Sequence, residues 1–188
     1  MRADAPFTRR LRRWVLAASA VEVVGYAISA VGARTMLLYN LYWPLEFTLL
    51  LGLGATIAPL PPRLLAALAL PFAAIWGWSA TRVDLLQELA STSVIAGALL
   101  QAGLYLYLFW HVAGTVPGRL RDAPAVWLCL AVLVYYGACG PLLGSINYFV
   151  RVDLSLALTL YHITQALCVL KFGLMATACL RNAHPAER

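Results

Sequence analysis

Six long apolar segments run along the chain, and the short stretches between and around them hold every one of its arginines. An apolar stretch of about 20 residues is what an α-helix needs to cross a bilayer. Proline, arginine and aspartate interrupt the apolar pattern at the connections, as expected for turns between helices. The segments cover residues 14–33, 37–58, 64–79, 88–112, 125–148 and 154–180. The pattern predicts an all-α fold, a polytopic transmembrane helix bundle of about six helices with short connections.

The third segment is the weakest of the six. It is short, and it carries Pro71 near its middle, where a proline removes a helical hydrogen bond. A bundle of five spanning helices is therefore an alternative. With six, the chain divides into a basic N-terminal segment at 1–13, a transmembrane domain at 14–180 and a C-terminal tail at 181–188.

The composition adds that the chain is not a soluble domain. Hydrophobic residues make up 62% and charged residues 12%, and the mean hydropathy is +0.78. Too few charges are present to cover a soluble surface, which excludes a soluble enzyme, a disordered chain and a secreted disulfide scaffold. The net charge is +6, and five arginines lie within the first 13 residues. Beside an apolar segment, such a cluster meets anionic headgroups, so we expect the lipid bilayer and no nucleic acid as a partner.

The distribution of arginine also predicts the orientation. Positive residues in short loops are retained on the cytoplasmic side of a membrane. With the N-terminus inside, ten of the thirteen arginines fall on the inner side. We therefore expect cytoplasmic N- and C-termini in a multi-pass protein of the cell inner membrane. No stretch outside the segments is long enough to fold alone, so any activity lies within the bundle, at its ends, or in a partner protein.

Four ionisable residues fall inside the apolar segments: Glu22, Glu46, His162 and Lys171. Such groups are costly in lipid unless they are paired or hydrated, so each is a functional candidate. Counted from the helix ends at about 1.5 Å per residue, Glu22 and Lys171 share a height in the inner half. We expect them to form a buried ion pair, with either a packing or a functional role. An alternative is that Lys171 reaches the inner headgroups.

By the same count, Glu46 and His162 share a height in the outer half of the bundle. Pro44 cannot donate to the carbonyl of Asn40, which leaves that carbonyl free as an acceptor in the same neighbourhood. The residues expected to form a ligand site or proton pathway at this height are Tyr39, Asn40, Tyr42, Glu46, His162 and Gln165. A few polar groups walled by aromatic rings are typical of a small-molecule pocket. The alternative is that these polar side chains hold helices together.

Small residues form two stripes at helical spacing, Gly140 with Gly144 and Gly25 with Ser29 and Ala33. Such stripes let backbones approach closely, either within the chain or in a homo-oligomer. The four cysteines lack the spacing of metal ligands, and we expect neither a metal nor a cofactor. The chain contains no phosphate-binding glycine loop, zinc-protease motif or serine nucleophile elbow. A non-enzymatic role is therefore favoured, although an intramembrane enzyme with Glu46 and His162 as its acid and base is an alternative.

Part of the chain resembles a group of small, uncharacterised bacterial multi-pass membrane proteins. Residues 37–54 (LLYNLYWPLEFTLLLGLG) are similar to the second helix of that group, in which an aromatic-rich turn precedes a glutamate and a phenylalanine. Residues 123–140 (APAVWLCLAVLVYYGACG) and 161–180 resemble later helices. The resemblance implies a membrane fold of about six helices and an important role for the helix that carries Glu46.

These features favour an integral membrane sensor, or the membrane subunit of a larger system, that recognises a small or lipidic ligand in the outer half of the bundle. Because no soluble domain is present, such a role requires a partner signalling protein. The alternative is a small transporter or an ion or proton channel with Glu46 and His162 in the pathway. In that case Glu22 and Lys171 would gate the inner side.

Overall fold

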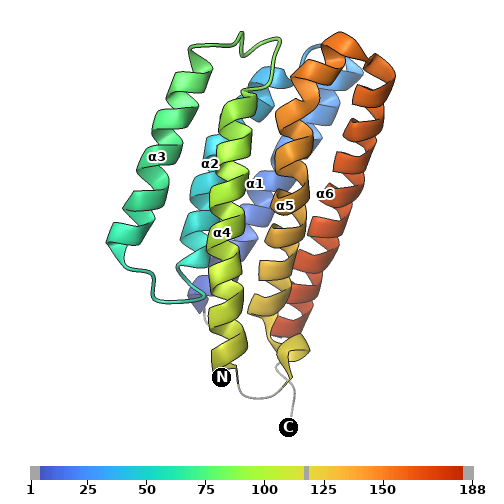
Figure 1. Cartoon of the computed structure of the whole chain (residues 1–188). Helices are drawn as coiled ribbons and strands as arrows, with labels where there is room; N and C mark the ends of the chain where they lie inside the picture. The colour runs from blue at the N-terminus through green and yellow to red at the C-terminus, as the bar shows by residue number, and fades with distance from the viewer. Residues whose placement is uncertain (1–4, 117–118, 184–188) are drawn as a thin grey trace.

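The computed structural model describes residues 5–116 and 119–183. Six α-helices and one short 3-10 helix make up this part of the chain (Figure 1). They are α1 (Ala5–Ala30), α2 (Met36–Gly54), α3 (Pro62–Ala80), α4 (Ser91–Thr115), η1 (Leu120–Asp122), α5 (Pro124–Val152) and α6 (Leu154–Ala183). Each of the six described α-helices is long and apolar enough to cross a membrane. The predicted six-helix bundle is therefore confirmed, and α3 continues through Pro71, so the five-helix alternative is wrong.

The first helix is longer than its apolar segment predicted. It begins at Ala5, so four arginines expected in a separate basic segment, Arg9, Arg10, Arg12 and Arg13, belong to its first turns, and Arg2 lies outside the described residues. Phe7, Leu11 and Trp14 recur at helical spacing and are buried, while the arginines between them are exposed. The Arg10 guanidinium also donates to the carbonyl of Gly52 at the end of α2, where a helix favours positive charge. The first turns of α1 therefore pack on the bundle through an apolar face, while the arginines lie on the opposite, exposed face.

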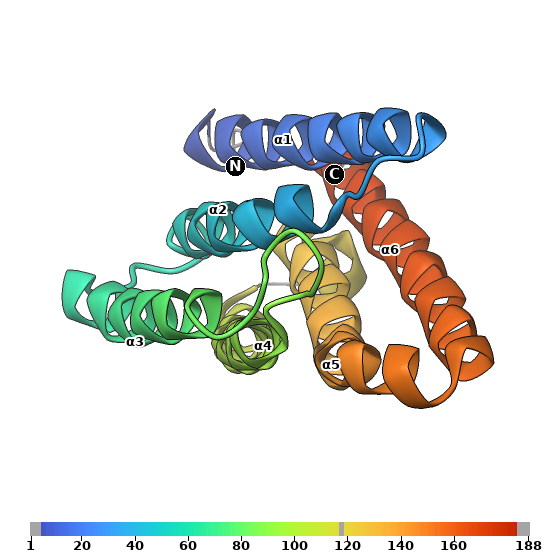
Figure 2. The same cartoon turned by 90° about the horizontal axis from the view of Figure 1, so that it is seen from above.

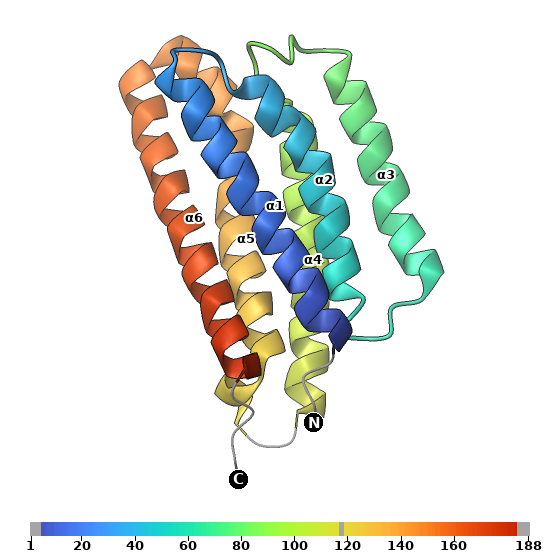
Figure 3. The ribbon, with the colours of Figure 1, turned by 180° about the vertical axis from the view of Figure 1, so that it is seen from behind.

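Consecutive helices run antiparallel, so α1 begins and α6 ends at the same end of the bundle (Figure 1). We call this the terminal end, and the other the opposite end. The helices α4, α5 and α6 pack one against the next, while α2 packs on α4 and α1 packs on α2. Seen from above, α3 lies at the edge, against α4 and α2 (Figure 2). The view from behind shows α1 crossing the bundle obliquely (Figure 3).

Small residues bring α4 and α5 together. A Cβ added to Gly140 would lie 2.7 Å from the Cβ of Ala98, and one added to Gly144 would overlap the side chain of Ile95. The predicted stripe of Gly140 and Gly144 therefore serves a contact within the chain. A homo-oligomer stays a prediction.

The half of the bundle nearer the terminal end has a closely packed apolar core. Leu50 and Leu53 of α2, Leu108 of α4 and Leu128 of α5 are fully buried there. The hydroxyl of Tyr105 donates to the carbonyl of Leu50 across 3.0 Å, so this polar group is also satisfied. Toward the opposite end α1 and α2 stand apart from α5 and α6, and a cavity replaces the core between these two pairs.

Candidate functional site

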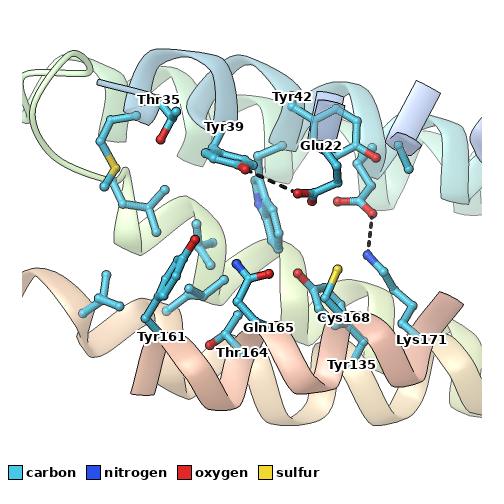
Figure 4. Close-up of a pocket in the computed structure, with 18 of the residues that line it drawn as sticks. Glu22, Thr35, Tyr39, Tyr42, Tyr135, Tyr161, Thr164, Gln165, Cys168 and Lys171 are labelled. Atoms are coloured by element: carbon cyan, nitrogen blue, oxygen red, sulfur yellow. Dashed lines mark hydrogen bonds and ion pairs between the residues drawn. The ribbon is translucent and has the colours of Figure 1, made fainter. Parts of the chain in front are cut away.

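The cavity has a volume of about 170 Å³ and lies between α1, α2, α5 and α6, close to the start of α4 (Figure 4). Its walls are mainly aromatic and aliphatic. Its polar lining residues are Glu22, Thr35, Tyr39, Tyr42, Glu46, Tyr135, Tyr161, Thr164, Gln165 and Lys171. Those of α2 and those of α6 each follow a spacing of three, four and seven, which places them on one face of each helix.

A buried ion pair closes one side of the cavity. The Nζ of Lys171 lies 3.1 Å from an Oε of Glu46, and each side chain is only 4% exposed. The same Nζ lies 3.8 Å from the centre of the Tyr135 ring. The rings of Trp14 and Phe172 are 5.3 and 5.4 Å away. A carboxylate and several aromatic faces thus surround the ammonium group, which offsets the cost of burying it.

The predicted pair of Glu22 with Lys171 is wrong, because Lys171 pairs with Glu46. Glu22 also lines the cavity, and its carboxylate accepts a hydrogen bond from the hydroxyl of Tyr39 across 3.4 Å. The predicted height assumed upright helices that start at the first apolar residue. The longer α1 begins at Ala5 and crosses the bundle obliquely (Figure 3), so a count of residues from its first apolar position does not give the height of Glu22.

A glycine makes room for this hydrogen bond. A Cβ added to Gly25 would lie 2.8 Å from the hydroxyl oxygen of Tyr39. Only glycine therefore lets the Tyr39 ring approach α1 closely enough to reach Glu22. Gly25, the first residue of the second predicted small-residue stripe, therefore makes a close contact within the chain, with Tyr39 of α2.

His162 does not join Glu46, so the predicted cluster of these two residues does not form. The imidazole lies on the exposed side of α6, outside the cavity lining, with its ring centre 6.1 Å from that of Tyr161. The height of a residue does not fix its direction around the helix. Gln165, predicted for the same site, does line the cavity.

Asn40 also lies away from the cavity, on the side of α2 that faces α3 and α4. Its Nδ2 donates to the carbonyls of Leu85 and Glu88 across 3.0 and 2.9 Å. Its Oδ1 accepts from the backbone N–H of Ala90 across 2.9 Å. The carbonyl that Pro44 frees, expected near the site, accepts instead from the indole of Trp76 across 3.2 Å. Asn40 therefore holds the α3–α4 connection in place.

The cavity is open at one end and closed at the other. Tyr161 and Met36, near the opposite end of the bundle, are 47% and 38% exposed. Trp43, Glu46 and Lys171 are buried. Beyond them, the ring of the fully buried Trp14 lies 5.8 Å from that of Phe172. Aromatic side chains thus cover the floor on the side of the terminal end.

Several cavity residues escaped prediction from the sequence. Tyr135 comes from the middle of α5, and Thr164, Cys168 and Phe172 come from α6. A signal was present for the last three, because Thr164 and Cys168 lie seven and three residues before Lys171 and Phe172 follows it. Nothing in the sequence singles out Tyr135, because it lies in a long apolar helix that carries no charged residue near it.

Comparisons of the chain with protein-family models, with curated proteins and with solved structures gave no match. The fold is that of an integral, multi-pass membrane protein, with six described helices long and apolar enough to span a membrane and a cavity between α1, α2, α5 and α6.

Proposed function

We propose that this protein is a membrane sensor, or the membrane subunit of a larger system, that binds a small or lipidic ligand in the cavity. The observation that carries the proposal is the buried pair of Glu46 and Lys171, which lines an open cavity rather than a packed interface. Ionisable groups at membrane depth usually mark functional sites. A mainly apolar pocket with a few convergent polar groups is typical of small-molecule binding.

The size of the cavity limits the ligand. A cavity of about 150 Å³ in another protein accommodates a molecule such as benzene. A volume of about 170 Å³ therefore suits a small organic molecule, or one end of a lipid, rather than a complete lipid.

The distribution of arginine supports entry from outside the cell. If the terminal end faces the cytoplasm, the cavity opens toward the outer leaflet. A ligand would then bind from the outer side, and its effect would pass along the helices to a partner signalling protein at the terminal end.

The closed floor favours binding over free conduction of ions. Below Lys171, the side chains of Trp14, Phe172 and Met175 are apolar, and Trp14 and Met175 are buried. A proton or cation would need a hydrated or polar route through this layer. One feature still supports the alternative of a transporter: the ionisable pair of Glu46 and Lys171 lines the open cavity.

Ligand binding can be tested by thermal unfolding in a maltoside detergent with a panel of ammonium ions, carboxylates, short alcohols and phospholipids. We expect at least one class to raise the unfolding midpoint, by roughly 5 to 10 °C at about a hundred times its Kd. Ala18→Leu should remove the effect, because Ala18 is a buried lining residue. Ala27→Leu, on the exposed side of the same helix, is the matched control. An equal shift in the Ala18→Leu protein would contradict the proposed site.

The alternative of a channel is tested by proton flux into proteoliposomes that contain a pH-sensitive dye. We expect no flux above that of empty liposomes. Flux through the native protein that Glu46→Gln abolishes would replace the sensor with a channel or transporter.

A further inference from the structure

The cavity contains two carboxylates but one cation. Counted at formal charges, Glu22 and Glu46 contribute two negative charges and Lys171 contributes one positive charge. Lys171 pairs with Glu46. Among residues 5–116 and 119–183, no ion pair involves Glu22, and its carboxylate accepts a hydrogen bond from the neutral hydroxyl of Tyr39. The open part of the cavity is therefore left with one negative charge in excess.

The side chain of Lys171 shows how the cavity accommodates an ammonium group. One carboxylate oxygen lies 3.1 Å from the nitrogen of Lys171, and the centre of the Tyr135 ring lies 3.8 Å from the same nitrogen. The surroundings of Glu22 repeat these components. Tyr39 touches Glu22, and Tyr42 and Tyr161 line the same space from α2 and α6 (Figure 4). The carboxylate and the aromatic rings are present there, and no lysine or arginine of the part of the chain that the structure describes pairs with Glu22.

We propose that the cavity binds an organic ammonium group, whose nitrogen pairs with Glu22 and lies against the rings of the surrounding tyrosines. This inference rests on the proposed function and names the ligand class. Aromatic cages with a nearby carboxylate recognise ammonium ions through cation–π and Coulomb attraction, both of which are stronger away from water. A bound ammonium would also neutralise the excess charge of the cavity.

An anionic ligand fits the site less well. It would have to displace Glu46 from the buried and aromatically enclosed Lys171, and it would then stand near two carboxylates. An inorganic divalent cation also fits less well. Such ions need about six oxygen ligands, whereas aromatic and aliphatic side chains make up most of the walls.

The same ammonium chemistry has two sources, a free organic cation and a lipid headgroup. Choline and ethanolamine occur both as soluble molecules and as the headgroups of phosphatidylcholine and phosphatidylethanolamine. Either form can reach Glu22 from the open end of the cavity, where Tyr161 is about half exposed.

The test is thermal unfolding of the full chain in a maltoside detergent, titrated with choline or ethanolamine against sodium chloride of equal ionic strength. A parallel series places the protein in nanodiscs of phosphatidylcholine or phosphatidylglycerol. We expect a rise of roughly 5 to 10 °C at about a hundred times Kd. A rise with the free ions identifies a soluble cation, and a rise with phosphatidylcholine alone identifies a headgroup.

Glu22→Gln should weaken ammonium binding by about tenfold or more, because it removes a charged partner. Glu88→Gln is the matched control. It makes the same change in a partly exposed residue of the opposite end that pairs with Arg151 and lies outside the cavity lining. If Glu22→Gln does not fold, Tyr161→Leu removes an aromatic wall at a partly exposed position and should also weaken binding.

Equal binding to the native and Glu22→Gln proteins would overturn the inference, as would the absence of any rise with ammonium ions or phosphatidylcholine. Stabilisation by acetate or another anion alone would overturn the ammonium assignment and leave the proposed function standing. If no compound of the whole panel stabilises the native protein, both the inference and the proposed function fail.

Discussion

The two faces of α2 handle polar groups in different ways. Toward α4, the side chains of Gln101 and Tyr105 are buried and donate to the carbonyls of Phe47 and Leu50. Toward α1 and α6, the same helix presents Tyr39, Tyr42 and Glu46 to an open cavity. One helix thus combines a packed interface with one wall of a site.

Trp43 lies between these two faces and belongs to both. Its indole donates to the carbonyl of Ser93 across 3.2 Å, and its ring lines the cavity beside Tyr136. A Cβ added to Gly97 would lie 2.8 Å from the indole nitrogen, so α4 fixes this ring closely. The difference between the faces teaches that polar residues within one spanning helix can have different kinds of partner. Backbone groups pair with the polar side chains on the packed face, and an ionisable side chain pairs with Glu46 on the cavity face.

The largest effect should come from breaking the ion pair on the cavity face. Lys171→Met strands Glu46 without its cation, and removing one partner of a buried pair costs about 3 to 5 kcal/mol. We expect the free energy of unfolding in detergent to fall by this amount. The double variant Lys171→Met with Glu46→Gln should recover much of the loss. A single variant as stable as the native protein would contradict the buried pair.

A substitution on the packed face should lower the free energy of unfolding somewhat less. Asn40→Leu removes three hydrogen bonds to the backbone of residues 85–90 and leaves those groups unsatisfied, at a cost of about 2 to 3 kcal/mol. Hydrogen exchange should become faster in the α3–α4 connection. Ligand binding should persist, since Asn40 does not line the cavity. Loss of binding in a folded Asn40→Leu protein would remove the distinction between the two faces.

A smaller effect should follow from moving one cavity side chain. Gly25→Ala places a methyl group against the Tyr39 hydroxyl and should displace the ring from Glu22, at a cost of about 1 kcal/mol. Ammonium affinity should fall with it. Gly103→Ala is the control, because a Cβ at Gly103 meets no atom within 4 Å, and alanine favours the helix. Equal effects of the two substitutions would mean that the close approach of Tyr39 is not needed.

The smallest effect should come from His162→Ala. The side chain is exposed and lies outside the cavity lining, so the free energy of unfolding should change by about 0.5 kcal/mol or less. Ligand-induced shifts of the unfolding midpoint should be those of the native protein. A loss of binding would restore His162 to the site.

The six-helix fold could be predicted because the length of a spanning helix is set by the bilayer and every arginine lies outside the six apolar segments. Glu22, Tyr39, Tyr42, Glu46, Gln165 and Lys171 were all predicted as site or ion-pair residues, and all six line one cavity. Their pairing could not be predicted. It depends on the oblique path of α1 and on the direction of each side chain around its helix, which no count of residues along a segment contains.

The cavity also has a mechanical meaning. On one side α1 packs on α2, and on the other side α6 packs on α5, so two helix pairs face each other across the space. The contact of Glu46 with Lys171 fastens one pair to the other. Under the proposed function, a molecule that enters from the opposite end would push the two helix pairs apart, with the contact of Glu46 and Lys171 as the pivot. The start of α1 and the last turns of α6 would then move at the terminal end.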